Sequence, residues 1–166
     1  MFCRGTETHF NVYGGGREMN MDQQVKKIIA ACGNNCASCP RYVAHPYEKT
    51  EEELHHTAEL WMKIGYRDHI ATNEEISCTG CKPNNWCRYH VAKCCGDRGI
   101  KNCAECGICP CTNLMECFAV TRSFEPRCRQ VCMKQEFNAL TRAFFEKEQN
   151  LEELRKDGSG DQSADA

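Results

Sequence analysis

The chain has 166 residues and a formal net charge of −2, and 16 of its residues are cysteine. A chain of this length predicts one domain with tails. Its charge becomes more negative when thiols ionise to bind metal, which excludes a general nucleic-acid binder, and no apolar stretch approaches the roughly 20 residues that cross a bilayer.

Residues 1–21 differ in character from the rest of the chain. They show no helical periodicity and include Gly14-Gly15-Gly16, so we predict a disordered leader in which Cys3 and His9 bind no metal. The leader lacks the continuous apolar segment of a signal peptide, so we expect a cytoplasmic, reducing setting. In that setting clustered cysteines favour metal sites or redox centres over disulfides.

The first helix is predicted over residues 22–32. Asp22 can cap it, Val25, Ile28 and Ile29 share one face, and a glycine follows it as a stop. The first group of cysteines is therefore expected at a helix C-terminus and in the turn that follows.

A second helix is predicted over residues 50–64. Thr50 and Glu53 form a capping box at its start. The spacing predicts one buried face, made of Leu54, Ala58, Trp61 and Ile64. His55 and His56 lie on the same helix, and we expect them to face solvent rather than to bind metal.

Residues 77–111 are rich in cysteine, glycine and asparagine, and without metal they cannot bury enough surface to hold one conformation. A short helix is predicted over residues 112–118 and a long helical pattern over residues 125–154. The core-facing stripe of the latter is Val131, Phe137, Leu140, Phe144 and Phe145. These features predict a small, metal-stabilised, mainly α domain over residues 22–156, with irregular cysteine-rich knuckles, little regular β structure and a disordered tail at 157–166.

Two Cys-x-x-Cys pairs carry the strongest chemical signal, and they are Cys78-Thr-Gly-Cys81 and Cys103-Ala-Glu-Cys106. The turn between two such cysteines aims backbone N–H groups at the sulfurs, which stabilises the thiolates. A glycine within or just after the turn allows a positive φ. Both pairs are typical of the knuckles that hold zinc in a tetrahedral site.

The first knuckle needs further ligands, and Cys87 and Cys94 are the natural completion. His90 lies three residues after Cys87 and is an alternative to one of them. Cys94 and Cys95 are adjacent, which disfavours both binding one ion. We therefore predict Cys94 as the ligand and Cys95 as a spare or buried thiol.

The second knuckle continues toward Cys109 and Cys111. We predict that Cys103, Cys106 and Cys111 share a metal ion, with Cys109 as an extra candidate. The run Cys-x2-Cys-x2-Cys is also similar to part of the ferredoxin pattern. A [4Fe–4S] cluster therefore stays open as the alternative to Zn²⁺.

A third set of predicted ligands is Cys32, Cys36 and Cys39. This set needs a fourth ligand from elsewhere, or it leaves one coordination position open for water or substrate. Its spacing also occurs in radical S-adenosylmethionine enzymes, but the chain is too short for the barrel of those enzymes. Three later cysteines remain, and they are Cys117, Cys128 and Cys132. We expect them either to form a further partial site or to pack as buried thiols.

Several of these blocks together resemble a known family, the small cysteine-rich family catalogued as domain of unknown function 3795. Residues 29–42 resemble its opening signature, and the blocks around Cys78-x-Gly80-Cys81 and Cys103-Ala-Glu-Cys106 follow in the same order. The resemblance implies a zinc-binding protein without an assigned activity. It also implies a ligand set, which is Cys32, Cys36, Cys39, Cys78, Cys81, Cys94, Cys103, Cys106 and Cys111. The spacing at Cys87 departs from the family, which leaves Cys87 and His90 as alternatives.

The leading functional hypothesis is a zinc-binding structural or interaction module with two or three thiolate sites. Its expected partner is a protein, and nucleic acid is a less favoured partner that residues 82–101 would contact through basic and aromatic side chains. The alternative is an iron–sulfur or thiol-redox protein that carries electrons or serves an anaerobic enzyme. Enzymatic activity stays open and is not favoured, because no His-Glu-x-x-His or zinc-deaminase motif supplies a general base.

Overall fold

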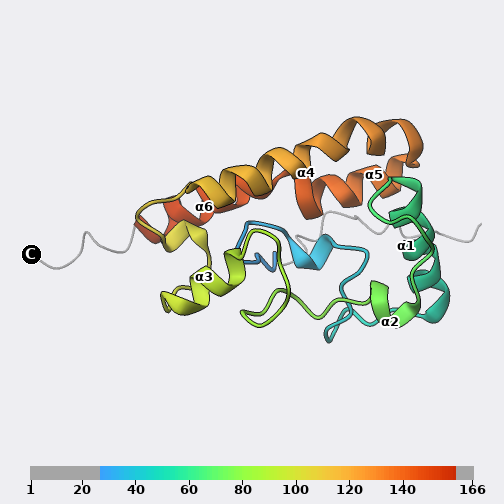
Figure 1. Ribbon diagram of the computed structural model, residues 1–166, viewed down its shortest axis with the longest axis horizontal. Coiled ribbons are helices and arrows are strands. Elements are labelled where there is room, and N and C mark those ends of the chain that lie inside the picture. The colour runs from blue at the N-terminus through green and yellow to red at the C-terminus, as the bar shows by residue number, and fades with distance from the viewer. Residues whose placement is uncertain (1–26, 160–166) are drawn as a thin grey trace, which may run out of the picture.

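The structure is a computed structural model that describes residues 27–159 of the chain. Its elements are helices, and they follow in the order η1 (Cys36–Ser38), α1 (Glu51–Lys63), α2 (Asn73–Ile76), α3 (Val91–Asp97), η2 (Cys103–Glu105), α4 (Thr112–Val131), α5 (Lys134–Leu140), the π-helical η3 (Thr141–Phe145) and α6 (Lys147–Ser159). The β structure in the described residues consists of two isolated bridges, Ile29 with Asn35 and Tyr42 with Cys78. The prediction of a mainly helical chain with little strand is therefore confirmed (Figure 1).

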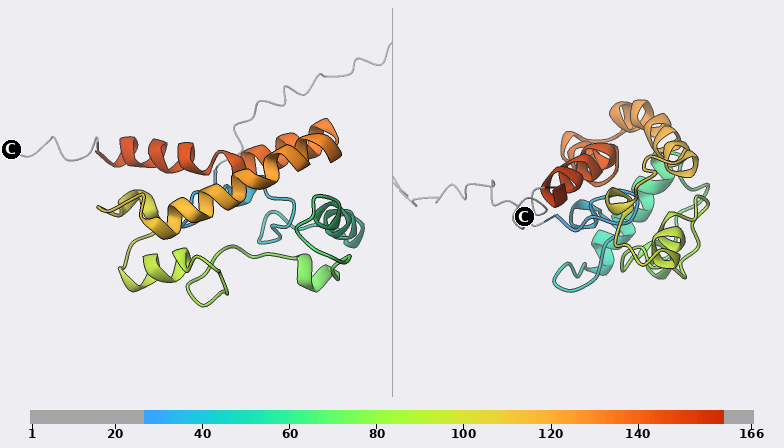
Figure 2. Two further views of the ribbon diagram at one scale, coloured as in Figure 1. Left: turned by 45° about the horizontal axis from the view of Figure 1, so that its top comes forward. Right: turned by 90° about the vertical axis from the view of Figure 1, so that its left-hand side faces the viewer.

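A helical hairpin forms one side of the molecule. α4 runs along it, and α5, η3 and α6 return beside α4 in the opposite direction (Figures 1 and 2). The chain reverses at Cys132 and Met133, whose backbones are extended, and the Met133 N–H donates to Glu136 at 2.6 Å to start α5. The two predicted helices over 112–118 and from 125 onward are thus joined in α4, and the second is interrupted at the reversal.

The predicted helix over residues 50–64 is confirmed as α1. Thr50 Oγ1 accepts a hydrogen bond from the Glu53 N–H at 3.2 Å, and the Glu53 carboxylate accepts one from the Thr50 N–H at 2.8 Å. The two bonds complete the capping box that the sequence predicts. All four residues of the predicted buried face are buried, and they are Leu54, Ala58, Trp61 and Ile64.

The predicted helix over residues 22–32 is wrong for its described part. Residues 27–32 form a tight loop in which the Cys36 N–H donates to the Ile28 carbonyl at 2.8 Å and the Ala30 N–H donates to the Asn34 carbonyl at 2.8 Å. The loop is fixed from the far end of the chain, because Asn150 Nδ2 donates to the Gly33 carbonyl at 2.9 Å. Such long-range contacts override a local helical pattern.

The ends of the predicted domain lie partly outside the described residues. The predicted leader over 1–21 and Asp22 lie outside them, as do residues 160–166. α6 extends to Ser159 and so includes residues 157–159, which the sequence analysis placed in the tail. Within the described residues, no helix combines the length and the apolar composition that crossing a bilayer requires.

Two separate hydrophobic cores lie under the hairpin. The first joins α1 and α2 to α4 and α5, and its buried residues include Leu54, Trp61, Ile76, Cys128 and Leu140. The second joins the first loop to α3, η2, α4 and α6, and its buried residues include Ala31, Val91, Cys95, Leu114 and Leu151. Cysteine side chains therefore contribute directly to the packing of both cores.

We expect Gly33→Ala to destabilise the protein far more than Gly65→Ala. Both glycines have a positive φ, of 90° and 81°, but a Cβ at Gly33 would lie 2.2 Å from the Lys147 carbonyl oxygen, whereas nothing lies within 4 Å of a Cβ at Gly65. Overpacking at Gly33 adds to the backbone strain, so we expect at least about 2 kcal/mol of additional loss in the free energy of unfolding. Chemical denaturation measures both variants, and equal losses would contradict close packing of this loop on α6.

Candidate metal centre

The fold gathers thirteen of the 15 cysteines in the described residues into two spatial groups. We define thiol group I as Cys32, Cys36, Cys39, Cys78, Cys81, Cys87 and Cys117, each of which interacts electrostatically with another member of the group. We define thiol group II as Cys94, Cys95, Cys103, Cys106, Cys109 and Cys111, which all line a second cavity. The remaining pair, Cys128 and Cys132, lies one helical turn apart on α4 and its C-cap and packs in the first hydrophobic core.

A short backbone pairing brings the first cysteine triplet beside the first knuckle. The Cys78 N–H donates to the Arg41 carbonyl at 2.8 Å, and the Val43 N–H donates to the Cys78 carbonyl at 2.9 Å. Residues 39 and 78 are far apart in the sequence, and this pairing places their segments side by side. The fourth ligand that the triplet needs is therefore available from the knuckle.

The knuckle itself has the geometry that its sequence predicts. Gly80 has a φ of 100°, and its backbone N–H donates to Cys78 Sγ at 3.4 Å. A residue with a Cβ is strained in this conformation. The glycine thus allows a backbone donor to reach the sulfur, which stabilises negative charge on it.

Burial and neighbouring thiolates raise the pKa values of three thiols of group I, which are Cys36, Cys39 and Cys81. Burial first, and then the charges of neighbouring thiolates, raise the pKa of Cys36 to about 12 and that of Cys81 to about 12. Burial also raises the pKa of Cys39 to about 11. Several thiolates so close together repel one another, and a bound cation removes the repulsion and favours the thiolate form.

Cys32 behaves differently from its neighbours because of Cys117 and Lys147. A hydrogen bond from the Cys117 thiol, with a further contribution from the Lys147 charge, lowers the pKa of Cys32 to about 6. The same hydrogen bond raises the pKa of Cys117. Lys147 Nζ lies 3.5 Å from Cys117 Sγ. The arrangement holds Cys32 as a thiolate between a thiol donor and a cation.

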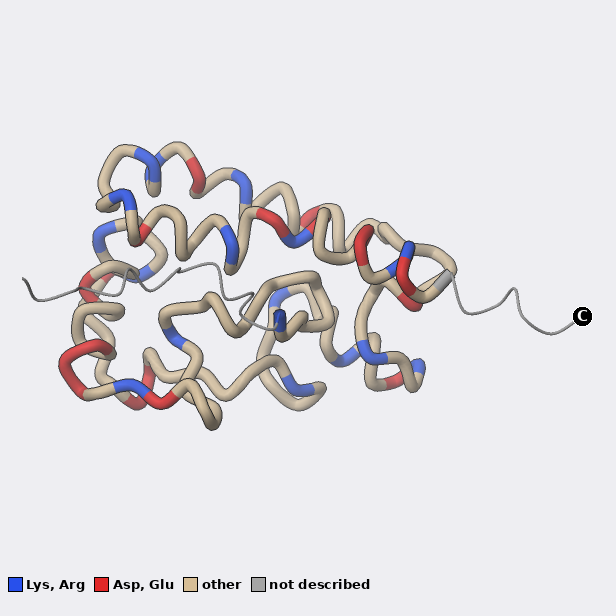
Figure 3. The backbone as a smooth tube through the Cα atoms, turned by 180° about the vertical axis from the view of Figure 1, so that it is seen from behind, with Lys and Arg blue, Asp and Glu red and all other residues tan. Residues whose placement is uncertain are grey.

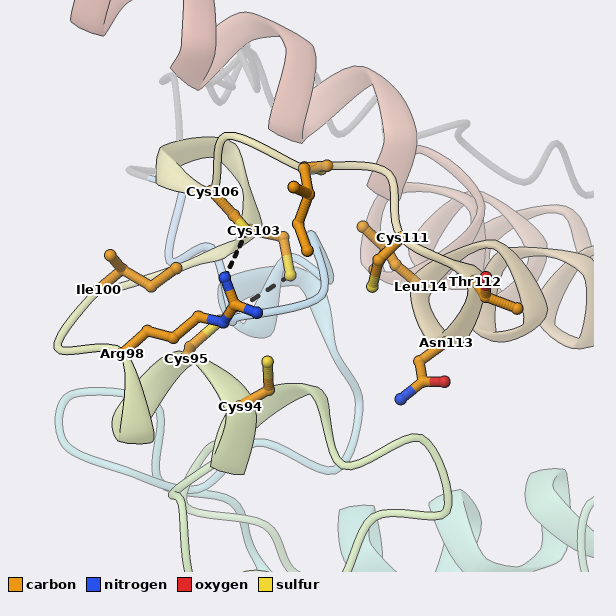
Figure 4. A pocket seen from close by; sticks show the side chains of 12 residues that line it. Cys94, Cys95, Arg98, Ile100, Cys103, Cys106, Cys111, Thr112, Asn113 and Leu114 are labelled. Atoms are coloured by element: carbon orange, nitrogen blue, oxygen red, sulfur yellow. Dashed lines mark hydrogen bonds between the residues drawn. The ribbon is translucent and has the colours of Figure 1, made fainter.

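Thiol group II surrounds an open cavity of about 310 Å³ between α3, η2 and the start of α4. Figure 4 shows the Arg98 guanidinium reaching in among the sulfurs, and Arg98 Nη1 donates to Cys106 Sγ at 3.8 Å. Cys95 Sγ and Cys103 Sγ lie 3.8 Å apart on one wall. The sulfurs of three separate segments therefore face one space.

The electrostatics of group II also favour a cation. Burial, followed by the neighbouring thiol of Cys95, raises the pKa of Cys103. A hydrogen bond with Cys94, and then the charge of Cys106, raises the pKa of Arg98, so the guanidinium and these two sulfurs favour opposite charges on each other.

The donor chemistry of both groups fits a thiophilic metal, but their geometry is not that of a closed site. Among residues 27–159, no set of three or more Cys, His, Asp or Glu side chains is arranged closely enough to hold a metal ion. All 15 cysteines in this range are free thiols. Sulfur is the preferred ligand of structural zinc and of iron–sulfur clusters, so the side chains would have to rotate inward to bind either.

The structure divides the predicted ligands differently from the sequence analysis. Cys87 lies with Cys81 in group I, as expected for that pair. Cys94 lies across from η2 in group II, together with Cys95, so it does not join the site begun by Cys78 and Cys81. His90 is exposed, has a φ of 52° and precedes α3.

Sequence reasoning left one residue of the candidate site open and missed another. Cys117 was expected to form a further partial site or to pack as a buried thiol, and it follows Leu114 by three positions on the buried face of α4. Lys147 was not singled out at all, and it is only 4% exposed. The sequence position of Lys147 could have indicated its burial, because it follows Phe144 of the predicted core stripe by three residues and thus continues that buried face.

Comparison with known proteins gives one family and no closer relative. The model of a family described as protein of unknown function (DUF3795) matches residues 28–116, which is more than half of the chain. The chain matches none of the curated proteins and none of the solved structures with which it was compared. The matched segment contains both knuckles, the first triplet and every cysteine of group II. The chain belongs to the DUF3795 family of proteins of unknown function.

Proposed function

We propose that this protein binds zinc through thiolates, with one metal centre in each thiol group, and that it serves as a structural or interaction module. The supporting observation is the gathering of thiols from distant segments into two groups. Group I combines the first triplet, the first knuckle and α4, and group II combines α3, η2 and the N-cap of α4. A free-thiol fold of this kind suits a reducing compartment such as the cytoplasm.

Metal would contribute mainly to folding. In the part of the chain that the structure describes, the second core contains seven buried residues, and two of them are cysteines of group II. A core so small offsets little of the entropy of ordering residues 77–111. A structural zinc site contributes roughly 10–16 kcal/mol of apparent binding free energy in small peptides, which is sufficient to order this segment.

A protein partner fits the exposed surface near the two groups. Trp86 is 88% exposed in the loop between the first knuckle and α3, Ile108 is 62% exposed at the rim of group II, and Met115 is 57% exposed in the first turn of α4. Large apolar side chains in such positions are enriched at protein interfaces. Metal binding would fix the loops that carry them.

A nucleic-acid partner receives less support. Two cations of the basic stretch are already paired, since Arg88 lies 3.5 Å from Glu116 and Lys93 lies 2.7 Å from Asp97. Arg98 faces the thiols of group II. Figure 3 shows Lys and Arg positions spread over the backbone and interspersed with Asp and Glu positions, which gives a weaker attraction for phosphates than a basic stripe would.

The alternative is an iron–sulfur or thiol-redox centre in group II. Its support is the set of six thiols around one cavity, which includes the run Cys103-x2-Cys106-x2-Cys109. Iron–sulfur clusters are held by four such thiolates. Group II therefore has enough ligands for a [4Fe–4S] cluster, and an electron carrier is the function that would follow.

Substitution of each group separately tests the proposal. We expect the double variant Cys36→Ser/Cys81→Ser to lose about half of the bound zinc and Cys106→Ser/Cys111→Ser to lose the other half, because each removes two ligands from one four-ligand site. Metal content per chain, measured by mass spectrometry of the purified proteins, gives the result. Cys132→Ser, which lies in neither group, is the matched control and should keep all its zinc.

Two results of that experiment would oppose the proposal. Full zinc content in both double variants would show that these thiols are not the ligands. Loss of all the metal in either variant, with the other half of the fold intact, would show one shared centre instead of two.

A further inference from the structure

Cys128 and Cys132 are the two cysteines of the described residues that belong to neither thiol group. Cys132 is the C-cap of α4, and its N–H donates to the Cys128 carbonyl at 3.0 Å. Residues one helical turn apart present their side chains on the same side of a helix, and the Cys128 thiol donates a hydrogen bond to Cys132. Within residues 27–159 they form no metal site with a third side chain, so this contact between two thiols needs another explanation.

The two thiols differ in what can reach them from solvent. Cys128 is 1% exposed and belongs to the first hydrophobic core, whereas Cys132 is half-buried and packs against that core from outside. A dissolved oxidant can therefore touch Cys132, and the Cys128 sulfur is reached through Cys132. Redox-active cysteine pairs often have this arrangement, in which an accessible thiol reacts first and a neighbouring thiol resolves the product.

The end of α4 gives this pair room to approach. Residues one helical turn apart have Cβ atoms roughly 5–6 Å apart, and a disulfide needs roughly 3.5–4.5 Å, so a movement of about 1–2 Å is required. Cys132 has already left the helical conformation, with a ψ of 147°, and the chain reverses at Met133. Cys132 can therefore move toward Cys128 while the interior hydrogen bonds of α4 stay in place.

We propose that Cys128 and Cys132 are an oxidation site, which forms a reversible disulfide when a low-molecular-weight disulfide such as glutathione disulfide is the oxidant. The Cys132 thiolate attacks one sulfur of the oxidant, which gives a mixed disulfide and releases one thiolate. The Cys128 thiolate then attacks the Cys132 sulfur and releases the second. The protons of the two cysteines pass to the two released thiolates. Two protein thiols are thus oxidised and one disulfide is reduced to two thiols.

The surroundings of Cys132 make this oxidation slow. Burial, followed by the charge of Glu136, raises the pKa of Cys132, whereas the charge of Lys63 and the hydrogen bond from Cys128 lower it. The thiolate is the attacking species, and it is a minor form of Cys132 at neutral pH. We therefore expect oxidation to take hours, which is within the range of disulfide formation.

A simpler role for both cysteines is packing in the first core. That role accounts for the burial of Cys128, but it does not require a second, half-exposed thiol in contact with it. The two roles also differ in a measurable way. A thiol pair that serves only packing would stay reduced, or Cys132 alone would keep the mixed disulfide.

Peptide mapping of the full-length protein, purified without oxygen, separates the two roles. The protein is incubated at neutral pH with excess glutathione disulfide, alkylated and digested with trypsin. Trypsin cleaves after Arg127, Arg129 and Lys134, so Cys128 and Cys132 lie on different peptides. We expect mass spectrometry to show the two peptides joined by a disulfide, with loss of alkylation at both cysteines. Dithiothreitol should separate the peptides and restore alkylation.

Two single variants test the order of attack. Cys128→Ala should leave a lasting glutathione adduct on Cys132, because no thiol is in place to resolve it. Cys132→Ser should leave Cys128 free of glutathione, because the core shields it. If Cys128→Ala does not fold, the full-length protein and Cys132→Ser carry the test. A glutathione adduct on Cys128 in Cys132→Ser would refute the order of attack.

Full alkylation of both cysteines after prolonged oxidation would overturn the proposal, as would a disulfide that joins Cys132 to a cysteine of either thiol group. Zinc content is measured on the same samples. A protein that keeps its zinc and leaves this pair reduced would refute the oxidation site alone. A joined pair in a protein that binds no zinc would refute the metal proposal and leave the oxidation site intact.

Discussion

Removal of the metal is expected to disorder residues 77–111 while the first hydrophobic core stays folded. The segment has few apolar contacts of its own, and its knuckles lie among thiols that a bound cation would hold as thiolates. The binding free energy of a structural zinc site, roughly 10–16 kcal/mol, is comparable to the whole stability of a small domain, about 5–15 kcal/mol. The first core buries Leu54, Trp61, Ile76 and Leu140 without a predicted ligand among them.

Hydrogen exchange before and after treatment with a strong chelator measures this effect. Backbone amides of α3 and η2 should lose protection by several orders of magnitude, and those of α1 should keep most of theirs. Readdition of zinc should restore the protection. Unchanged exchange in both regions, after metal removal has been verified, would contradict a structural role for the metal.

Among single cysteine substitutions that leave the core packing untouched, Cys106→Ser is expected to lower metal content and the free energy of unfolding the most. Cys106 lies outside the buried core, and its Sγ accepts from Arg98 at the mouth of group II. Replacement by serine removes a thiolate ligand without creating a cavity. We expect loss of the metal from group II and a fall of more than about 3 kcal/mol in the free energy of unfolding. Metal analysis and denaturant unfolding measure the two quantities.

The choice of comparison variants matters for this prediction. Cys103→Ser would confound the result because Cys103 is buried in the second core. Cys132→Ser removes a half-buried thiol that belongs to neither group, and Cys3→Ser changes a cysteine outside the described residues. Neither control should lose metal. Full metal content and unchanged stability in Cys106→Ser would count against the ligand assignment in group II.

The parts of the fold that local sequence determines were predictable. The capping box at Thr50 and Glu53 fixes the start of α1, and the 3.6-residue spacing fixes the face that it buries. The knuckle at Cys78 was predictable for the same reason, since Gly80 determines its turn. These features depend on residues only three to ten positions apart.

The parts that long-range contacts determine were not predictable. The loop that replaces the helix expected over residues 22–32 is held by Asn150, more than a hundred residues away. The partition of cysteines into two groups likewise depends on the pairing of Tyr42 with Cys78, which no local pattern indicates. Cys94 was assigned to the first knuckle because it follows it in sequence, but α3 carries it to η2 instead.

The most direct test of the central claim is the metal content and visible absorbance of the full-length protein purified without oxygen. Thiolate zinc centres in both thiol groups predict about two zinc ions per chain and a colourless solution. Iron with matching acid-labile sulfide and a brown colour would replace zinc in group II by the iron–sulfur alternative. A folded, stable protein that contains neither metal would contradict the claim that these cysteines are metal ligands.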